Sequence, residues 1–315
     1  MPSTPAARVF VTRDLPGDAL ARLAEHVSVD VWPHDQPPTQ DELVAGATGC
    51  HGLITMLTEA VGDDVLAVAP DLAVVANMAV GYDNIDVDAC AQNGVVVANT
   101  PGVLAQTTAE LTIALMLAAT RRIVEAADAV KQGQWPDWHP GWMLGQDVDG
   151  ATLGIVGMGD IGRRVADIAR GLGMDVVHHN RSSGIPLDDL LRQSDVVSLH
   201  CPLTPATHHL IGTRELELMK STAVLVNMAR GDVVDTDALV TALRDRTIFG
   251  AGLDVTPEEP LPTDHPLLDL PNCTVLPHIG SASVRTRSVM ADLVVDNVLA
   301  VLDGREPLTP VPGSA

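Results

Sequence analysis

The chain contains 315 residues, which is enough for about two domains that each bury a hydrophobic core. Aspartate and glutamate outnumber lysine and arginine by 41 to 19, and the formal net charge of −22 makes nucleic acids and anionic membranes unfavourable partners. Aromatic residues make up only 2 % of the chain, so the core must consist of aliphatic residues, a composition typical of parallel sheets covered by helices.

The first hundred residues alternate short apolar runs with helical patterns, which predicts a parallel sheet with helical crossovers. Strands are expected at Val9–Val11, Val27–Val31, Gly52–Thr55, Ala73–Ala76 and Gly94–Ala98. Helices are expected at Gly17–Glu25, Gln40–Ala45, Asp63–Ala69 and Val87–Ala91. No glycine-rich phosphate turn follows the first strand, so we do not expect this domain to hold a dinucleotide.

The middle of the chain contains a long apolar segment and a cluster of tryptophans. Thr107–Val124 predicts one helix, and its nearly uniform apolarity favours burial on more than one side, as at a subunit contact. Residues 135–142 hold three of the four tryptophans, but two prolines and a glycine in this segment prevent a regular helix. Core packing, an interface anchor and a cover over a site all remain open as roles for these tryptophans.

The stretch Ala151–Gly173 predicts a cradle for the phosphates of a dinucleotide. An apolar run over Leu153–Val156 is followed by Gly157-x-Gly159-x-x-Gly162 and then by apolar residues at helical spacing. Gly157 permits the tight turn, Gly159 lets the backbone approach a pyrophosphate, and Gly162 lets the helix pack closely on the strand. The N-terminus of this helix would face the anion.

The alternating pattern continues to about His278 and predicts a six-stranded dinucleotide-binding domain. Strands are expected at Leu153–Val156, Asp175–His179, Val196–Leu199, Ala223–Asn227, Phe249–Asp254 and Thr274–Leu276. Helices are expected at Gly162–Gly171, Leu187–Gln193, Arg214–Lys220 and Thr236–Arg244, with a last helix at Ser281–Leu302.

If the last helix returns to the first domain, that domain is discontinuous and a cleft separates the two domains. We therefore expect an α/β fold with two doubly wound parallel-sheet domains. The flavodoxin-like substrate domain would comprise residues 1–100 and 290–315, and the Rossmann NAD(P)-binding domain would comprise residues 101–289.

Chemically active side chains follow three expected strands of the second domain. Arg230 follows the strand that ends near Asn227, Asp254 ends the next strand with Glu259 close behind it, and His278 follows the last strand. Each residue alone has an ordinary structural interpretation, such as a surface ion pair. Because the carboxyl ends of parallel strands share one edge of a sheet, their convergence predicts an acid/base and anion-binding set.

Three segments resemble the signature blocks of the D-2-hydroxyacid dehydrogenases: Val226–Gly231, Gly252–Pro260 and Leu276–Ala282. Within that family, Leu253–Pro266 and Asn272–Arg287 most resemble the glyoxylate/hydroxypyruvate reductases. The resemblance extends over essentially the whole chain.

The resemblance implies that Arg230, Glu259 and His278 form the catalytic set. His278 would donate a proton to the substrate carbonyl oxygen as hydride arrives at C2, while Glu259 would hydrogen-bond the other ring nitrogen. Arg230 would bind the carboxylate of a 2-oxo acid. The related formate dehydrogenases carry glutamine at the position of Glu259, so formate oxidation is disfavoured.

The resemblance also implies the residues that contact the ligands. Leu57, Val80, Gly81 and Arg230 would contact the substrate, whose carboxylate would also meet backbone N–H groups in Met78–Gly81. Trp138 would reach the substrate from the neighbouring subunit of a homodimer formed through the cofactor domain. Cofactor contacts are implied at Gly157, Met158, Gly159, Asp160, Ile161, Gly162, Asn180, Arg181, Ser182, Cys201, Pro202, Thr207, Met228, Ala229, Asp254 and Gly280.

The end of the second expected strand favours NADP(H) over NAD(H). Asn180 lies 18 positions after Gly162, where an acidic residue would accept the ribose hydroxyls of NAD. Arg181 and the serines after it could instead hold a 2′-phosphate, whereas a surface arginine with the ribose on Asn180 is the alternative. The adjacent His178 and His179 would point to opposite faces of a strand, so we expect no metal.

We therefore expect NADPH-dependent reduction of glyoxylate and hydroxypyruvate to glycolate and D-glycerate. One alternative is a dehydrogenase for a bulkier 2-oxo acid. Another is a non-catalytic, NAD(P)-sensing protein like the corepressors related to this family. Small 2-oxo and 2-hydroxy acids are the expected ligands besides the cofactor.

The cysteines and the N-terminal sequence predict a cytoplasmic protein. No C-x-x-C pair occurs among the scattered cysteines, so a disulfide framework or structural zinc site is not expected; they are Cys50, Cys90, Cys201 and Cys273. The first residues lack the pattern of a signal peptide, and the longest apolar segment, Leu111–Ala119, is too short to span a bilayer.

Overall fold

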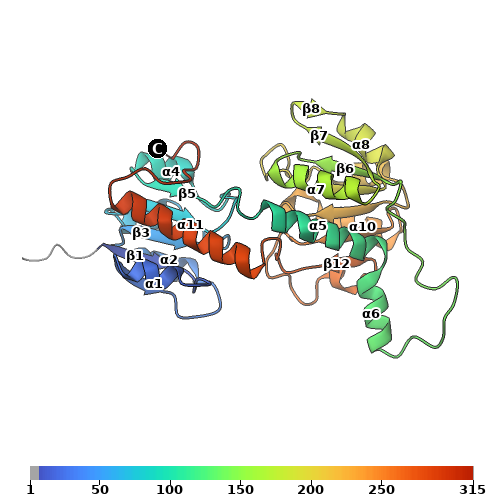
Figure 1. Cartoon of the computed structure of the whole chain (residues 1–315), viewed down its shortest axis with the longest axis horizontal. Coiled ribbons are helices and arrows are strands. Elements are labelled where there is room, and N and C mark those ends of the chain that lie inside the picture. The colour runs from blue at the N-terminus through green and yellow to red at the C-terminus, as the bar shows by residue number, and fades with distance from the viewer. Residues whose placement is uncertain (1–6, 315) are drawn as a thin grey trace, which may run out of the picture. The chain divides into compact units, whose positions relative to one another are not determined.

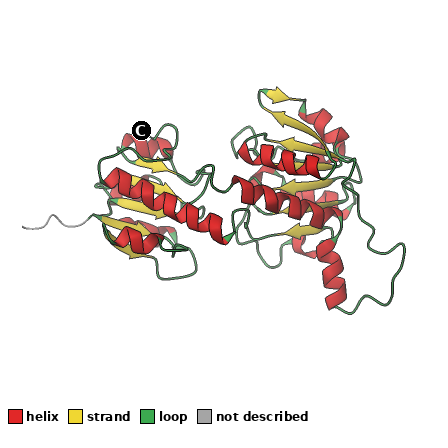
Figure 2. Cartoon of the chain, viewed as in Figure 1, coloured by secondary structure: helices red, strands yellow, loops and turns green. Residues whose placement is uncertain are grey.

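The computed structural model describes residues 7–314 of the chain. The chain divides into two compact units, with the division after Leu104 and again before Ala282, so the first unit contains both ends of the chain. Each unit consists of a sheet flanked by helices (Figure 1 and Figure 2). The expected α/β fold with two sheets is confirmed.

The first unit contains a five-stranded sheet in the order β2-β1-β3-β4-β5, in which every neighbouring pair is parallel. The central strands β3 and β4 are buried along their whole length, whereas the edge strand β2 is mostly exposed. This burial explains why the central strands are continuous apolar runs. The strands are β1 (Arg8–Val11), β2 (Ser28–Val31), β3 (Gly52–Thr55), β4 (Val74–Asn77) and β5 (Val96–Ala98).

Helices cover the two faces of this sheet. The helices α1 (Ala19–Ala24) and α11 (Val284–Leu302) pack on each other, and α11 also packs on β3 and β4. Arg22 of α1 donates hydrogen bonds to Asp292 and Asp296 of α11, which ties the C-terminal helix to the N-terminal part of the unit. The other helices form a separate apolar cluster with the sheet; they are α2 (Gln40–Ala47), α3 (Asp63–Val68) and α4 (Val87–Gln92).

The second unit contains a seven-stranded sheet in the order β12-β11-β10-β9-β6-β7-β8. Its strands are β6 (Thr152–Val156), β7 (Asp175–Asn180), β8 (Ser183–Gly184), β9 (Val196–Leu199), β10 (Val224–Asn227), β11 (Gly250–Leu253) and β12 (Cys273–Val275). All neighbouring pairs are parallel except β7 and β8, which pair in antiparallel fashion. The order reverses between β6 and β9, so the turns after these strands flank the position where doubly wound sheets bind ligands.

The helices of the second unit differ from the expected pattern mainly at its start. The expected helix Thr107–Val124 is wrong at its C-terminal end, because Arg122 adopts a left-handed backbone conformation (φ 54°) that separates α5 (Ala105–Thr120) from α6 (Ile123–Lys131). The remaining helices are α7 (Asp160–Gly171), α8 (Leu187–Gln193), α9 (Thr213–Leu218) and α10 (Thr236–Arg244), with short 3₁₀ helices η1 (Gly231–Val233) and η2 (Pro266–Asp269).

The buried core of both units is aliphatic, as the composition requires. All four cysteines carry free thiols. Among residues 7–314, no helix combines the length and apolarity that a bilayer crossing needs.

Candidate active site

The glycine turn between β6 and α7 has the geometry of a phosphate cradle. Gly157 has a φ of 100°, and a Cβ there would lie 2.6 Å from the backbone nitrogen of Cys201. A Cβ on Gly162 would collide with the carbonyl oxygen of Gly157. Both glycines are therefore required by the protein itself. A Cβ on Gly159 would meet no atom within 4 Å, so the space beside Gly159 is open.

The N-terminus of α7 leaves hydrogen-bond donors directed at that open space. Gly159 is the N-cap residue and provides no side-chain hydrogen bond to the helix. The first N–H groups of a helix lack partners within the helix and carry partial positive charge. A helix of 12 residues that begins at a turn with open space fits the pyrophosphate of a dinucleotide.

Asn180 at the end of β7 holds the glycine turn in place. Its Oδ1 atom accepts a hydrogen bond of 2.7 Å from the backbone N–H of Met158, and its Nδ2 atom donates to Oγ of Ser183 at 3.2 Å. Arg181 and Ser182, which follow it, are exposed in the turn before β8. The position that carries an acidic residue in NAD-binding proteins thus holds a neutral amide, next to an exposed cation.

Arg230 follows β10 at the carboxyl edge of the same sheet. Its backbone is extended (φ −141°, ψ 151°), and its carbonyl oxygen accepts a hydrogen bond of 2.9 Å from Nδ2 of Asn227. Gly231 packs so tightly on the backbone of Thr256 that a Cβ at Gly231 would collide with it. This contact holds the segment of Arg230 against the segment that follows β11.

His278 and Glu259 form a hydrogen-bonded pair at the same edge. His278 Nδ1 lies 2.7 Å from Glu259 Oε2, and the other Glu259 oxygen accepts a hydrogen bond of 3.1 Å from the backbone N–H of Thr256. Burial alone would raise the pKa of Glu259, but the hydrogen bond and charge of His278, aided by the Thr256 amide and the charge of Arg230, lower it. Glu259 is therefore held as a carboxylate beside the imidazole.

Asp254 supports the segment that carries His278. This buried carboxylate accepts hydrogen bonds of 2.8 Å from the backbone N–H groups of Ile279 and Gly280, and its own carbonyl oxygen accepts one of 2.9 Å from the N–H of His278. His278 has a left-handed backbone (φ 53°), which these hydrogen bonds maintain. Burial raises the pKa of Asp254 against the lowering effect of these hydrogen bonds. A contact between Asp254 and the cofactor stays a prediction.

In the first unit, two backbone donors are available near the expected substrate residues. Asn77 donates to the carbonyl of Gly81 at 2.8 Å and Asn99 to that of Val80 at 2.7 Å. Within residues 7–314, the N–H groups of Val80 and Gly81 donate no hydrogen bond, whereas those of Met78 and Ala79 are engaged. Of the residues in this segment whose N–H groups are expected to contact an anion, Val80 and Gly81 are therefore the two with an available N–H group. Leu57 is half-buried in the segment that follows β3.

The other expected ligand residues lie in loops of the second unit or at the start of α7. Trp138 is 77 % exposed on the long loop after α6. Cys201, Pro202 and Thr207 follow β9, and the hydroxyl of Thr207 donates to the carbonyl of Pro202 at 2.6 Å. Met228 and Ala229 are buried just after β10. Asp160 and Ile161 begin α7.

Sequence reasoning missed His200, which follows β9 next to the glycine turn. Its Nε2 atom lies 2.8 Å from Oγ of Ser198, and its Nδ1 atom is buried with no hydrogen-bond partner among the described residues. Burial lowers the pKa of His200 to about 4, so the ring is neutral at physiological pH. The carbonyl of His200 is one of the atoms that a side chain at Gly157 would strike.

Comparisons with known proteins identify the family to which the chain is similar. The family model of the D-isomer specific 2-hydroxyacid dehydrogenase NAD-binding domain matches residues 113–280, more than half of the chain. A curated relative, the glyoxylate reductase of Korarchaeum cryptofilum (strain OPF8), is 47 % identical over 312 residues, which cover 95 % of this chain and 94 % of the relative.

Two solved structures closely resemble the whole chain. The TT0316 protein of Thermus thermophilus is 49 % identical with a TM-score of 0.93, covering 96 % of this chain and 99 % of that protein. An NADPH-dependent glyoxylate/hydroxypyruvate reductase from Sinorhizobium meliloti, solved with NADP and malonate, is 33 % identical with a TM-score of 0.86, covering 98 % of each chain.

Proposed function

The chain belongs to the family of D-isomer specific 2-hydroxyacid dehydrogenases, and we propose that it reduces glyoxylate and hydroxypyruvate with NADPH to glycolate and D-glycerate. Family membership makes it an NAD(P)-dependent oxidoreductase. The observation that carries the substrate proposal is the His278–Glu259 pair at the same sheet edge as Arg230. The names of the relatives, which include a glyoxylate reductase and a glyoxylate/hydroxypyruvate reductase, support the same substrates.

The proposed catalytic roles follow from which side-chain and backbone atoms already have hydrogen-bond partners in the protein. A nicotinamide cofactor, when bound, would supply the hydride that C2 of the substrate receives. Because Nδ1 of His278 is engaged by Glu259, Nε2 is the ring nitrogen that donates a proton to the carbonyl oxygen. Glu259 keeps the ring oriented and stabilises its protonated form. Arg230 binds the substrate carboxylate and polarises the carbonyl. In the first unit, the free N–H groups of Val80 and Gly81 are suited to an anion.

The preference for NADPH is proposed from the turn that follows β7. Asn180 presents no carboxylate, so nothing at this position repels a 2′-phosphate or binds the ribose hydroxyls as strongly as an acid would. Arg181 follows directly and is exposed, and a guanidinium is suited to pairing with such a phosphate. A relative from Sinorhizobium meliloti with the same fold has been solved with NADP. NAD(H) remains the alternative cofactor.

A homodimer formed through the cofactor-binding unit is proposed from the apolar surface of that unit. Figure 1 shows α6 and the loop after it projecting from the sheet. On these segments Ile123 and Val130 are each 52 % exposed, and Trp135 and Trp138 are 58 % and 77 % exposed. A surface this apolar favours a protein partner. Light scattering coupled to size exclusion should give twice the mass of one chain, and a monomeric mass would contradict the dimer.

Initial-rate kinetics test the proposed function directly. Purified protein is assayed with glyoxylate, hydroxypyruvate and a panel of bulkier 2-oxo acids, each with NADPH and with NADH. The proposal expects the highest kcat/KM for the two small acids with NADPH. Higher values for bulky acids would support the second substrate class, and tight NADPH binding without turnover would support a sensing protein. His278→Asn should abolish most of kcat in an enzyme and leave cofactor binding intact.

A further inference from the structure

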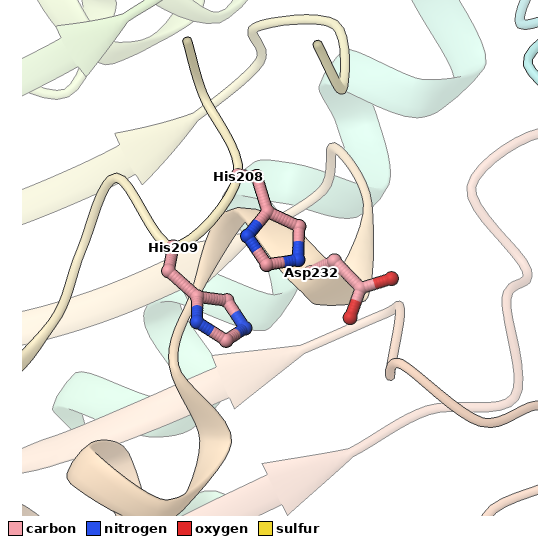
Figure 3. A group of neighbouring side chains, drawn as sticks. All are labelled: His208, His209 and Asp232. Carbon is pink, nitrogen blue, oxygen red and sulfur yellow. The ribbon is translucent and has the colours of Figure 1, made fainter. Parts of the chain in front are cut away.

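We propose that His208, His209 and Asp232 form a surface site for a divalent transition-metal ion, with Zn²⁺ as the expected occupant (Figure 3). One ligand atom from each of the three side chains lies within 4.8 Å of the other two. Both histidines are exposed and Asp232 is half-buried. The site lies entirely in the second unit, and the proposal stands independently of the substrate and cofactor proposed above.

The backbone conformation of His209 brings two neighbouring histidines to the same side. In an extended strand neighbouring side chains point to opposite faces, as expected for His178 and His179 in β7. His209 instead has a left-handed backbone (φ 51°), and its ring stacks on that of His208 with centroids 4.0 Å apart and planes 24° from parallel. This conformation is uncommon for a residue with a Cβ. The two imidazoles can thus serve one ion.

Main-chain hydrogen bonds fix the histidine segment to the aspartate segment. The backbone N–H of His209 donates to the carbonyl oxygen of Asp232 at 2.7 Å, and that of Ile211 donates to the carbonyl oxygen of Val233 at 3.1 Å. Before the histidines, the backbone N–H of His208 donates to the carbonyl oxygen of Thr204 at 2.9 Å, which closes a turn. The backbones that carry the three ligands are therefore pre-positioned, and only side-chain rotations remain.

The donor set selects the class of ion. Two imidazole nitrogens and one carboxylate oxygen suit Zn²⁺ and its neighbours, whereas Mg²⁺ and Ca²⁺ prefer sets made of oxygen alone. Zinc takes such ligands at about 2.0–2.2 Å, so the three atoms must approach one another slightly by side-chain rotation. Exposure of the histidines leaves room for water as a fourth ligand, and the chain's charge of −22 attracts cations.

The ligand atoms of these side chains are available. Within residues 7–314, the side chains of His208, His209 and Asp232 make no hydrogen bond or ion pair, and the histidine stacking leaves the ring nitrogens at the ring edges. Imidazole binds metals only in its neutral form, so zinc binding should weaken on acidification. The proposal replaces the sequence-based expectation that the chain binds no metal.

The position of the site links two segments that flank the active-site edge. His208 directly follows Thr207, whose hydroxyl closes the turn after β9, and Asp232 lies two residues after Arg230. An ion held by both segments would tie the loop after β9 to the loop that carries Arg230. We therefore expect bound Zn²⁺ to raise the thermal unfolding midpoint.

Calorimetric titration of tag-free, chelator-treated protein with ZnCl₂ tests the proposal. The expected result is one Zn²⁺ per chain, with no comparable binding of Mg²⁺. His208→Ala and Asp232→Asn should each weaken zinc binding by at least about tenfold, because changes even outside the ligand sphere cost that much. His209→Gly removes the third ligand while glycine retains the left-handed backbone. His26→Ala, which changes an exposed histidine of the first unit, is the matched control.

Thermal unfolding gives an independent measurement with the same variants. Zn²⁺ should raise the unfolding midpoint of the wild type and of His26→Ala, and it should leave those of His208→Ala and Asp232→Asn unchanged. All substituted side chains are at least partly exposed, so the apo variants should unfold near the wild-type midpoint. Absence of stoichiometric zinc binding to the wild type would overturn the proposal. Zinc binding that survives in both His208→Ala and Asp232→Asn would also overturn it.

Discussion

The Nδ1 atom of His278 lies 2.7 Å from Oε2 of Glu259, and the second oxygen of Glu259 is held by the backbone N–H of Thr256 at 3.1 Å. Because both carboxylate oxygens are fixed, Glu259 can hold the imidazole in one orientation and leave Nε2 for the substrate. The lowered pKa of Glu259 keeps this partner ionised. A glutamine at this position could reproduce part of this hydrogen-bonding geometry but none of the negative charge.

Glu259→Gln should lower kcat for glyoxylate reduction by about 10²-fold, because the neutral amide no longer stabilises the protonated imidazole that donates the proton. The KM for NADPH should change little. In steady-state kinetics, the activity of both proteins should fall as the pH rises, and that of the variant should begin to fall at a lower pH than that of the wild type. Glu258→Gln, at the exposed neighbouring residue, is the control and should keep wild-type rates. Equal rates for Glu259→Gln and wild type would contradict the assignment of Glu259.

The same pair predicts a pH dependence of stability. The pKa of Glu259 is lowered from its ordinary 4.5 in the folded protein. Its contribution to the free energy of unfolding is therefore fully present above pH 4.5 and is lost as the pH falls through the lower folded value. Urea unfolding of the wild type and of Glu259→Gln should differ most near neutral pH, and the difference should shrink in acid. A difference that grows on acidification would have the wrong sign.

Asp254→Asn should distinguish two roles of Asp254, support of the His278 loop and contact with the cofactor. The carboxylate of Asp254 accepts one hydrogen bond on each oxygen, from the N–H groups of Ile279 and Gly280, whereas an asparagine has one acceptor oxygen. A buried N–H left without a partner lowers the free energy of unfolding by about 1–3 kcal/mol. We expect kcat to fall about tenfold or more as the loop loses its position. Fluorescence titration of the same variant gives the Kd for NADPH: a raised Kd would support the predicted cofactor contact of Asp254, and an unchanged Kd would exclude it. A normal kcat would contradict the supporting role.

His200 should make the protein less stable in mild acid. The unfolded chain protonates this residue at the ordinary pKa of 6.5, whereas burial lowers the folded value to about 4. The free energy of unfolding should therefore fall as the pH drops below 6.5, by about 2 kcal/mol at about pH 5 from this residue. His200→Asn should remove this part of the pH dependence, and His34→Asn, at an exposed histidine, should not. Parallel pH profiles for wild type and His200→Asn in urea unfolding would refute the prediction.

Asn180→Asp should shift cofactor use from NADPH towards NADH. An aspartate still accepts the hydrogen bond from the Met158 N–H, so the glycine turn keeps its shape, but its charge repels a 2′-phosphate and binds ribose hydroxyls. The ratio of kcat/KM values for NADPH and NADH should fall by about tenfold or more, which corresponds to about 1.4 kcal/mol. Arg181→Ser should lower the same ratio, while Arg192→Ser, which removes an exposed arginine on α8, should not. An unchanged ratio in both site variants would exclude the proposed phosphate contact.

Much of the fold could be predicted because parallel sheets impose continuous apolar runs. The buried strands β3, β4, β9 and β10 are such runs, and the sequence predicts all of them within a residue or two. The strand β8 could not be predicted, because Ser183 and Gly184 are not apolar and their pairing follows from the turn after Asn180. The break between α5 and α6 was missed because Arg122, neither glycine nor proline, adopts a left-handed backbone.

The candidate site divides in the same way. Arg230, Asp254 and His278 could be predicted because each lies at or just after the end of a strand. Open parallel sheets bind their ligands beyond the carboxyl ends of the strands. The supporting contacts could not be predicted: Asp254 holds N–H groups 25 and 26 residues further along the chain. The proximity of His208 and Asp232 likewise depends on a left-handed residue and on pairing between distant segments. Such features arise from tertiary structure alone.

Gly159 and Gly162 provide a matched test of cofactor placement within one motif. A Cβ at Gly162 would collide with the carbonyl of Gly157, so Gly162→Ala should disturb the packing of α7 on β6 and lower the unfolding midpoint markedly. A Cβ at Gly159 would meet no protein atom, and its φ of −78° is acceptable to alanine, so Gly159→Ala should fold normally. Its methyl group would occupy the space proposed for the pyrophosphate, and the Kd for NADPH should rise about tenfold or more. Thermal unfolding without cofactor and fluorescence titration with NADPH measure the two effects separately. Tight NADPH binding by a folded Gly159→Ala would mean that the cofactor phosphates lie elsewhere. The added methyl group contacts no protein atom, so it can weaken binding only by occupying the space of the phosphates.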